Sequence, residues 1–196
     1  MLNMNIKGVI MIGSEEWKKR RAQRVSGTDC GVILGFSKFR TPMDLWRQKM
    51  GIGAPFESNQ YIEWGNRLEQ DVALKFHQTH GVWLTDGVYV EKDWRCGTPD
   101  RLIYGEREGL EIKTAGERYA AQYKRGEIPK DYEYQCRWYM ALLDYDCWFL
   151  AALVGGNKYF EFRIERDMEL EADMLNKCES FYINNILGKL PPGEVK

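Results

Sequence analysis

The sequence lacks several features that would assign a function directly. Its 28 Lys and Arg residues are balanced by 29 Asp and Glu residues, which leaves a formal net charge of -1. Without a basic surplus, the chain cannot bind nucleic acid through its overall charge, so any such partner must be held by a local basic patch. The longest apolar run, residues 147–154, is too short to span a bilayer.

The five cysteines also exclude two classes of site. They are odd in number and widely spaced, and no two of them form a Cys-x-x-Cys pair. A disulfide framework or a zinc site needs paired or clustered cysteines, so we expect buried, reduced thiols. The N-terminus carries no signal-peptide pattern. Together these absences predict a cytoplasmic protein that does not interact with a membrane.

What is present indicates one folded domain. The 196 residues suffice for a sizeable core, and an aromatic content of 13% with seven Trp argues against disorder. Apolar spacing with Gly and Pro punctuation predicts a helix from Ser14 that Gly27 breaks, a helix over 30–34 capped by Thr28 or Asp29, and further helices over 43–50, 59–79, 119–125, 132–143 and 167–187. Strands are predicted over 83–91, 99–104, 110–114, 147–154 and 159–164.

The stretch 98–113 carries the strongest chemical signal. Asp100 lies near the start of one expected strand, and Glu111 and Lys113 lie on the next, after a turn bracketed by Gly105 and Gly109. Alternate strand residues face opposite ways, so Glu111 and Lys113 share one face while their apolar neighbours face a core. Two carboxylates and an ammonium group in one place are suited to a divalent cation and phosphodiester hydrolysis.

A third carboxylate needs an explanation. Glu69 lies on the apolar stripe of the helix predicted over 59–79. A carboxylate on a core-facing stripe costs several kcal/mol unless it is paired or bound to a cation. Either a buried Arg partner or a metal ion in the active site would account for it.

A short basic run precedes the catalytic stretch. Lys18, Lys19, Arg20, Arg21 and Arg24 provide five positive charges within seven residues. Such a run is either a solvated helix face or a phosphate-binding helix. The following Gly27 and Thr28, expected at a helix N-terminus, would be either a plain cap or a source of N–H and hydroxyl donors for an anion.

The order of these motifs resembles the lambda-exonuclease-like viral recombinase (YqaJ) family of the PD-(D/E)xK nuclease superfamily. Pro99-Asp100 with Glu111-x-Lys113 matches the superfamily motif, and Gly65 to Glu69 and the later Gln135 match two further ones. The N-terminal signature is matched by Trp17, Arg21, Gly27, Thr28 and Asp29. The family's run from Ser to Gly is matched over 37–51 by Ser37, Thr41, Pro42, Leu45, Trp46, Lys49 and Gly51.

The resemblance implies a fold and roles for the matched positions. The fold would be an α/β, restriction-endonuclease-like core with a mixed central sheet flanked by helices, in one domain over 1–196. Helices within 14–50 would form a DNA-end pocket, followed by a catalytic core over about 59–165 and the C-terminal helix 167–187. Asp100, Glu111, the Ile112 backbone carbonyl and Glu69 would bind Mg²⁺, with Mn²⁺ as a substitute.

The remaining matched residues would act on the water and on the DNA end. Lys113 would position the attacking water, and Gln135 would orient Lys113 or the nucleophile. Arg21, Thr28 and Lys38 match positions that hold a 5′ phosphate, although Thr28 stands where the family usually has Ser and Lys38 where it has Pro or a basic residue. The implied activity is a 5′-to-3′ exonuclease on double-stranded DNA ends that leaves 3′ single-stranded overhangs.

The resemblance also implies a partner and an oligomeric state, and two alternative functions remain open. The overhang would pass to a phage annealing protein, and similar family members form ring-shaped trimers. An endonuclease of the same superfamily and a non-catalytic DNA-binding module are the alternatives. The iron–sulfur type of this superfamily is disfavoured because the clustered cysteines that would hold its cluster are missing.

Overall fold

A five-stranded mixed sheet forms the centre of the computed structural model, which describes residues 10–53 and 58–193. Its strand order is β2 (Leu84–Asp86), β5 (Arg101–Ile103), β6 (Glu108–Ala115), β7 (Cys147–Val154) and β8 (Lys158–Glu165). Only β6 and β7 run parallel; the other neighbours are antiparallel. The predicted mixed sheet is therefore confirmed, and β6, the strand of the expected carboxylate and ammonium groups, is its middle strand.

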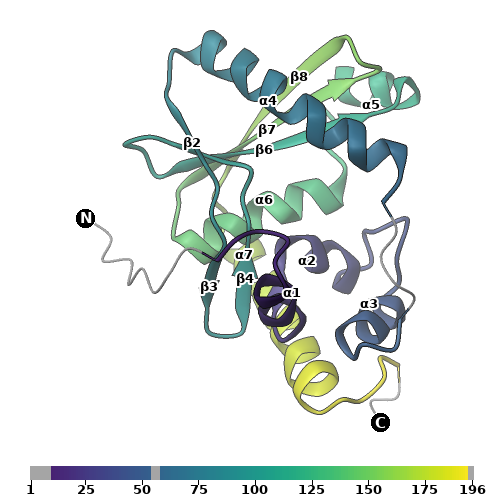
Figure 1. Cartoon of the computed structure of the whole chain (residues 1–196). Coiled ribbons are helices and arrows are strands. Elements are labelled where there is room, and N and C mark those ends of the chain that lie inside the picture. The colour runs from purple at the N-terminus through teal and green to yellow at the C-terminus, as the bar shows by residue number, and fades with distance from the viewer. Residues whose placement is uncertain (1–9, 54–57, 194–196) are drawn as a thin grey trace.

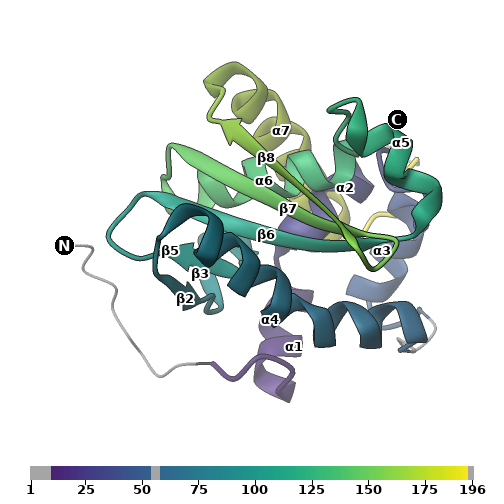
Figure 2. The same ribbon diagram turned by 90° about the horizontal axis from the view of Figure 1, so that it is seen from above.

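Helices cover both faces of this sheet (Figures 1 and 2). Helix α4 (Gln60–His80) lies on one face, where Val72, Ala73 and Phe76 pack against Leu110 and Ile112 of β6. Helices α6 (Lys130–Leu143), α7 (Met168–Phe181) and α2 (Gly27–Ile33) lie on the other face, around a second core. The two cores explain why residues 109–112 of β6 are buried.

Helix α4 begins and ends where its sequence signals predict. The Asn59 side chain caps the first turn by accepting a hydrogen bond from the Ile62 N–H, and Gly81 ends the helix with a φ of 67°. A left-handed residue at this position satisfies the last carbonyls at no steric cost when it is glycine. No helix in the described ranges is both long enough and apolar enough to cross a membrane.

The expectation of one strand over 83–91 is wrong. The segment forms β2 of the large sheet and β3 (Val90–Lys92), which belongs to a separate sheet with β4 (Arg95–Gly97) and β1 (Val25–Ser26). The break is at Gly87, whose N–H donates to the Asp100 carbonyl at 3.1 Å. A Cβ on Gly87 would lie 1.6 Å from the Pro99 carbonyl oxygen, so only glycine permits the chain to cross there.

The second helix also begins earlier than expected. Helix α1 (Glu15–Ala22) ends before Gly27, and α2 starts at Gly27 with Ser26 as its N-cap. Both the Ser26 N–H and its hydroxyl donate to Asp29 Oδ2, at 3.0 and 2.8 Å. The predicted cap at Thr28 or Asp29 is therefore wrong. Both residues lie inside the first turn, because Ser26 and Asp29 form a Ser-x-x-Asp capping box that starts the helix at Gly27.

The remaining helices agree with prediction in kind. Helix α3 (Pro42–Lys49) follows a Thr41 cap, and the 3₁₀ turn η1 (Glu117–Tyr119) leads into α5 (Ala120–Lys124). The helix predicted over 167–187 is α7 followed by the π-helical turn η2 (Tyr182–Leu187). A single Asp167 side chain caps it, accepting from the N–H groups of Glu169 and Leu170.

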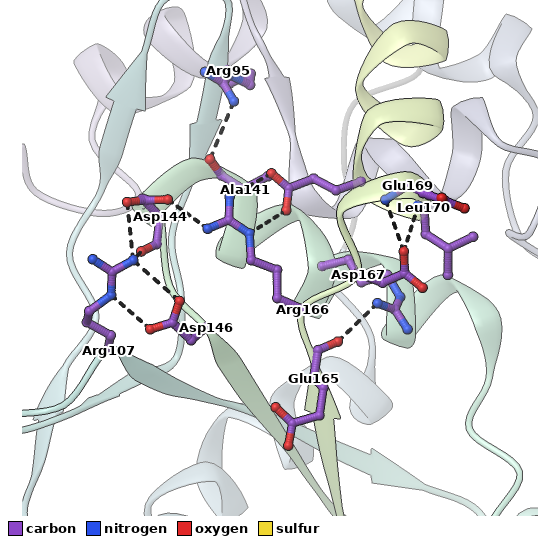
Figure 3. Close-up of polar contacts among 12 residues, drawn as sticks. Arg95, Arg107, Ala141, Asp144, Asp146, Glu165, Arg166, Asp167, Glu169 and Leu170 are labelled. Carbon is purple, nitrogen blue, oxygen red and sulfur yellow. Dashed lines mark hydrogen bonds and ion pairs between the residues drawn. The ribbon is translucent and has the colours of Figure 1, made fainter.

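A polar network anchors the turn between β5 and β6 (Figure 3). Arg107 in this turn contacts Asp144 and Asp146, which connect α6 to β7. Arg166, after β8, contacts the same Asp144 at 2.7 Å and Glu171 of α7 at 2.8 Å. These contacts hold the far end of the β5–β6 hairpin against the helices behind the sheet.

A buried ion pair joins the three N-terminal helices. Lys49 Nζ lies 2.7 Å from Asp29 Oδ2, and the two side chains are 5% and 3% exposed. The same ammonium donates to the backbone carbonyls of Arg21 and Arg24, at 2.8 and 2.6 Å. Burial raises the pKa of Asp29, but the charges of Lys49 and Arg21 outweigh it and lower that pKa to about 2.

We predict that Lys49→Met lowers the free energy of unfolding by about 3–5 kcal/mol, because it leaves the buried Asp29 carboxylate without its main partner. Urea denaturation followed by circular dichroism measures the loss. The exposed pair of Lys177 with Asp173 provides a matched control, and Lys177→Met should leave the unfolding midpoint nearly unchanged. Equal effects of the two substitutions would contradict a structural role for the buried pair.

The pH dependence has a definite sign. The folded-state pKa of Asp29, about 2, lies below its ordinary value of 3.8. Its contribution to stability is therefore complete above the ordinary pKa and is lost as the pH falls through about 2. The difference in stability between the wild type and Asp29→Asn should narrow across that acidic range.

Candidate active site

The middle strand separates a core face from a chemical face. Leu110 and Ile112 of β6 pack under α4, while Glu111 and Lys113 point the other way, toward α6. Asp100, just before β5, joins them because its Oδ2 accepts a hydrogen bond from the Ile112 N–H at 2.7 Å. The predicted convergence of two carboxylates and one ammonium group is thus observed.

Helix α6 provides the side chain that links these groups. Gln135 Nε2 donates to Glu111 Oε1 at 2.7 Å, and Gln135 Oε1 accepts from Lys113 Nζ at 3.1 Å. Lys113 also pairs with Glu111 at 2.5 Å, and its ammonium lies 5.0 Å from the centre of the Tyr132 ring. The predicted contact between Gln135 and Lys113 is present, so Gln135 holds the ammonium and the carboxylate in one arrangement.

The electrostatics of this cluster favour an added cation. Burial and the charge of Glu111 raise the pKa of Asp100 well above its usual range. Burial likewise raises the pKa of Glu111, although Lys113 opposes it. Burial alone would lower the pKa of Lys113, but the two carboxylates outweigh it and raise that pKa. The buried Glu111 and the half-buried Asp100 share one ammonium, so the cluster is short of positive charge.

The donor set fits a hard divalent cation. Glu111 is 1% exposed, yet its Oε2 has no hydrogen-bond partner among the described residues. Asp100 and Glu111 would supply two carboxylate ligands. Within the described residues, no group of three or more His, Cys, Asp or Glu side chains is arranged to hold a metal ion. A site with two carboxylates matches the preference of Mg²⁺, which keeps water and substrate phosphate among its ligands.

Glu69 has the partner that the ion-pair alternative requires. Its Oε1 lies 2.5 Å from Arg101 Nη1, and Arg101 is buried and also donates to the Asp100 carbonyl at 2.6 Å. This pairing accounts for a carboxylate on the apolar stripe without a metal ion. The charge of Glu69 still adds to the causes that raise the pKa of Asp100 and Glu111. Its role as a ligand stays a prediction.

A cavity of about 220 Å³ connects the carboxylates with the N-terminal helices. Arg21 Nη2 donates to Thr28 Oγ1 at 2.5 Å and to Ser26 Oγ at 3.2 Å, and its guanidinium lies 5.0 Å from the Trp17 ring. We call Arg21, Ser26 and Thr28 the Arg21 cradle. The cavity wall includes Arg21, Ser26, Thr28, Asp100, Glu111 and Lys113.

Lys38 lies elsewhere. Lys38 does not line this cavity. Its ammonium lies 5.9 Å from the centre of the ring of Tyr119, a residue of the turn η1 that follows β6. The structure therefore brings Arg21 and Thr28 together, as predicted for a phosphate pocket, and leaves Lys38 outside that group.

The basic residues over 18–24, at and just after the end of α1, differ in their contacts. Arg20 and Arg24 pair with Glu91 of β3, and Lys18 pairs with Glu15. Of the five charges only Arg21 lines the cavity. Helical periodicity turns Arg21 away from its neighbours and into the cavity, and its binding of a phosphate stays a prediction.

Sequence reasoning missed two residues that build the site. Ser26 has no assigned role in the sequence analysis, although its spacing to Asp29 is a recognisable capping pattern; the structure places its hydroxyl beside Arg21. Arg101, adjacent to Asp100, was not singled out, and its partner Glu69 is far away in the sequence. No local signal identifies such a pair.

Comparisons with known proteins agree on one family and one fold. A family model described as the YqaJ-like viral recombinase domain matches residues 16–146. The uncharacterized protein YqaJ of Bacillus subtilis is 33% identical over 186 residues, which cover 91% of this chain and 58% of that protein. The chain thus spans little more than half the length of this curated relative.

Two solved structures resemble the fold. An alkaline exonuclease from Laribacter hongkongensis has a TM-score of 0.72 at 18% identity, covering 90% of this chain and 94% of that one. A phage-related exonuclease from Haemophilus somnus has a TM-score of 0.66 at 17% identity, covering 85% of this chain and 96% of that one. At such identities the likeness establishes a shared fold, that of phage-type exonucleases.

We predict that the carboxylate pair binds Mg²⁺ and that binding raises the thermal unfolding midpoint of the wild type. Asp100→Asn and Glu111→Gln should each abolish this increase, because the site loses a charge that it cannot replace. Asp100→Asn should also unfold at a higher temperature than the wild type without metal, since it relieves repulsion between carboxylates.

Differential scanning fluorimetry over a Mg²⁺ titration provides the measurement. Asp173→Asn, which removes a half-exposed carboxylate from α7, is the matched control and should retain the wild-type response. A full Mg²⁺ response in Asp100→Asn would remove that residue from the metal site.

Proposed function

The chain belongs to the YqaJ-like viral recombinase domain family, and on that premise we propose that it is a metal-dependent DNA exonuclease. We assign it 5′-to-3′ polarity on double-stranded ends, leaving 3′ single-stranded overhangs. One observation carries the proposal: a single cavity holds the carboxylate pair, the Lys113 ammonium and the Arg21 cradle. The Laribacter exonuclease, which shares the fold, has been solved in complex with dAMP, a nucleotide.

Each group in the cavity has a distinct chemical task. A bound Mg²⁺ would offset the carboxylate charge and acidify a water molecule for attack on phosphorus. Lys113, fixed by Glu111 and Gln135, directs its ammonium toward the phosphate that reacts and stabilises the negative charge that develops there. Gln135 prevents the ammonium from swinging away, because its amide is itself held by Glu111 and by the Tyr139 hydroxyl.

The Arg21 cradle explains why an end is preferred over an internal site. A terminal 5′ phosphate carries more negative charge than an internal diester and can accept more hydrogen bonds. The Arg21 guanidinium and the hydroxyl of Thr28 provide charge-assisted and neutral donors within the same cavity as the carboxylates. A phosphate bound there would set the next phosphodiester against the metal site.

Incubation with linear and closed circular duplex DNA, with and without Mg²⁺, tests the proposal. The expected result is release of 5′ mononucleotides from linear DNA with Mg²⁺ present and no cutting of closed circles. Cutting of closed circles would replace the exonuclease by an endonuclease. Absence of any cleavage with Mg²⁺ or Mn²⁺ would leave a non-catalytic DNA-binding module.

We predict that Arg21→Ala removes a preference for 5′-phosphorylated over 5′-hydroxyl ends. Each lost charged hydrogen bond is worth about 1.5–3 kcal/mol, so the rate on phosphorylated DNA should fall on the order of tenfold to a hundredfold. Arg20→Ala is the matched control, because Arg20 lies on the same helix but pairs with Glu16 and Glu91. Equal digestion of both kinds of end by the wild type would contradict the cradle assignment.

Lys113→Ala separates catalysis from metal binding. We predict a large loss of cleavage rate with little loss of Mg²⁺ affinity, because the ammonium acts on the phosphate and the water while the carboxylates hold the ion. Single-turnover cleavage and calorimetric Mg²⁺ titration measure the two quantities. An unchanged cleavage rate would remove Lys113 from the reaction.

A further inference from the structure

A second basic and aromatic cluster lies outside the cavity that holds Lys113 and the Arg21 cradle. Lys38 Nζ lies 5.9 Å and Arg118 Cζ 5.0 Å from the centre of the same Tyr119 ring. These residues come from two segments, the loop between α2 and α3 and the turn η1. Phe39, beside Lys38, is 78% exposed. We call Lys38, Phe39, Arg118 and Tyr119 the Tyr119 clamp.

The clamp lies next to the active site along the chain and within reach of its charges. Lys113 Nζ lies 5.0 Å from the centre of the Tyr132 ring, and η1 follows directly on β6, the strand of Lys113. Burial raises the pKa of Asp131, next to Tyr132, and both Lys113 and Lys38 oppose this shift, so the acid lies within the field of both cations. Lys113 thus lines the Arg21 cavity, and its strand leads to the turn that carries Arg118 and Tyr119.

The loop between α2 and α3, which carries Lys38 and Phe39, begins at a helix that is packed against α6. A Cβ on Gly31 of α2 would lie 3.0 Å from the Asp131 Cβ, so α2 packs closely on the start of α6. The Phe36 and Tyr134 rings lie 4.9 Å apart, which ties the loop after α2 to the same helix. Lys38 and Phe39 are therefore presented from a packed base, and their own side chains remain exposed.

The two cations of the clamp have no carboxylate partner among the described residues. Neither Lys38 nor Arg118 is in an ion pair with any residue that the structure describes. Glu117, adjacent to Arg118, contacts Lys158 across the sheet edge instead. Most arginines of the chain are paired with carboxylates, as in the contacts of Arg107 and Arg166. Cations without carboxylate partners around the half-buried Tyr119 ring, with the exposed Phe39 ring next in sequence to Lys38, are the kinds of groups that bind single-stranded nucleic acid through phosphates and stacked bases.

We infer that the Tyr119 clamp holds the DNA strand where it continues past the catalytic carboxylates, with Lys38 and Arg118 on its phosphates and Phe39 stacked on a base. This inference rests on the proposed nuclease function and deepens it, since it gives the site a second strand contact. The occupant is a single-stranded segment, because stacking on Phe39 requires a base released from its duplex partner. The Arg21 cradle and the clamp would then hold one strand on both sides of the bond that breaks.

Equilibrium binding tests the clamp without relying on cleavage. The probe is a labelled, 5′-phosphorylated single-stranded DNA of about 15 nucleotides, within the range of sites for single strands. Fluorescence anisotropy in EDTA over a series of salt concentrations gives the affinity and its salt dependence. The proteins are the wild type, Lys38→Ala/Arg118→Ala, Phe39→Ala, and the control Lys75→Ala/Lys177→Ala, which removes two exposed cations from α4 and α7.

The two kinds of contact predict different results. Loss of two phosphate contacts should reduce the slope of log affinity against log salt by about 1.4 and weaken binding on the order of tenfold or more at low salt. Phe39→Ala should weaken binding on the order of tenfold with an unchanged slope, because stacking releases no counterions. An unchanged slope in Lys38→Ala/Arg118→Ala, or the same change in the control, would overturn the clamp.

Digestion of linear duplex DNA with Mg²⁺, run in parallel, separates the clamp from the proposed function. If the wild type digests DNA while the clamp variants bind and digest as it does, the clamp fails and the nuclease assignment stands. If the wild type digests nothing but the clamp variants lose binding as predicted, the clamp stands as a DNA contact and the nuclease assignment fails. Urea midpoints near that of the wild type exclude misfolding of the variants.

Discussion

The rest of the site depends on how the negative charge of one buried carboxylate, Glu111, is offset. It is 1% exposed on the middle strand of the sheet, where an unpaired charge costs several kcal/mol. Lys113 and Gln135 satisfy one of its oxygens, and the other has no partner among the described residues. Asp100 beside it increases the deficit of positive charge. A bound cation would offset this deficit.

The same strand couples this charge cluster to the stability of the fold. Leu110 and Ile112 hold β6 against α4 on one face, so the carboxylate and the ammonium on the other face have little freedom to move apart. The backbone after β2 passes close to the backbone before β5, where Gly87 packs against the Pro99 carbonyl. This close approach fixes the backbone that leads into Asp100. Packing therefore provides the preorganisation that charge repulsion would otherwise oppose.

The distribution of positive charge shows how a nearly neutral chain can keep individual cations available for the proposed DNA partner. Arg20, Arg24, Arg107 and Arg166 are bound to carboxylates and hold elements together. Arg21 instead contacts hydroxyl groups in the cavity, which leave its charge available to an anion. The division between these roles depends on what each side chain meets, since all are the same residue type.

The sequence by itself determined the groups whose arrangement is local. Strand alternation placed Glu111 and Lys113 on one face, and helical spacing put Gln135 and Tyr139 together. The mixed sheet flanked by helices was implied by the resemblance of the sequence motifs to the nuclease family, and the structure confirms it. What only the tertiary structure decided were partners far apart in the chain: Arg101 for Glu69, Lys49 for Asp29, and Tyr119 instead of Arg21 for Lys38. Periodicity reports which face a residue occupies, whereas its partner is set by how distant elements pack, and no local pattern encodes that packing.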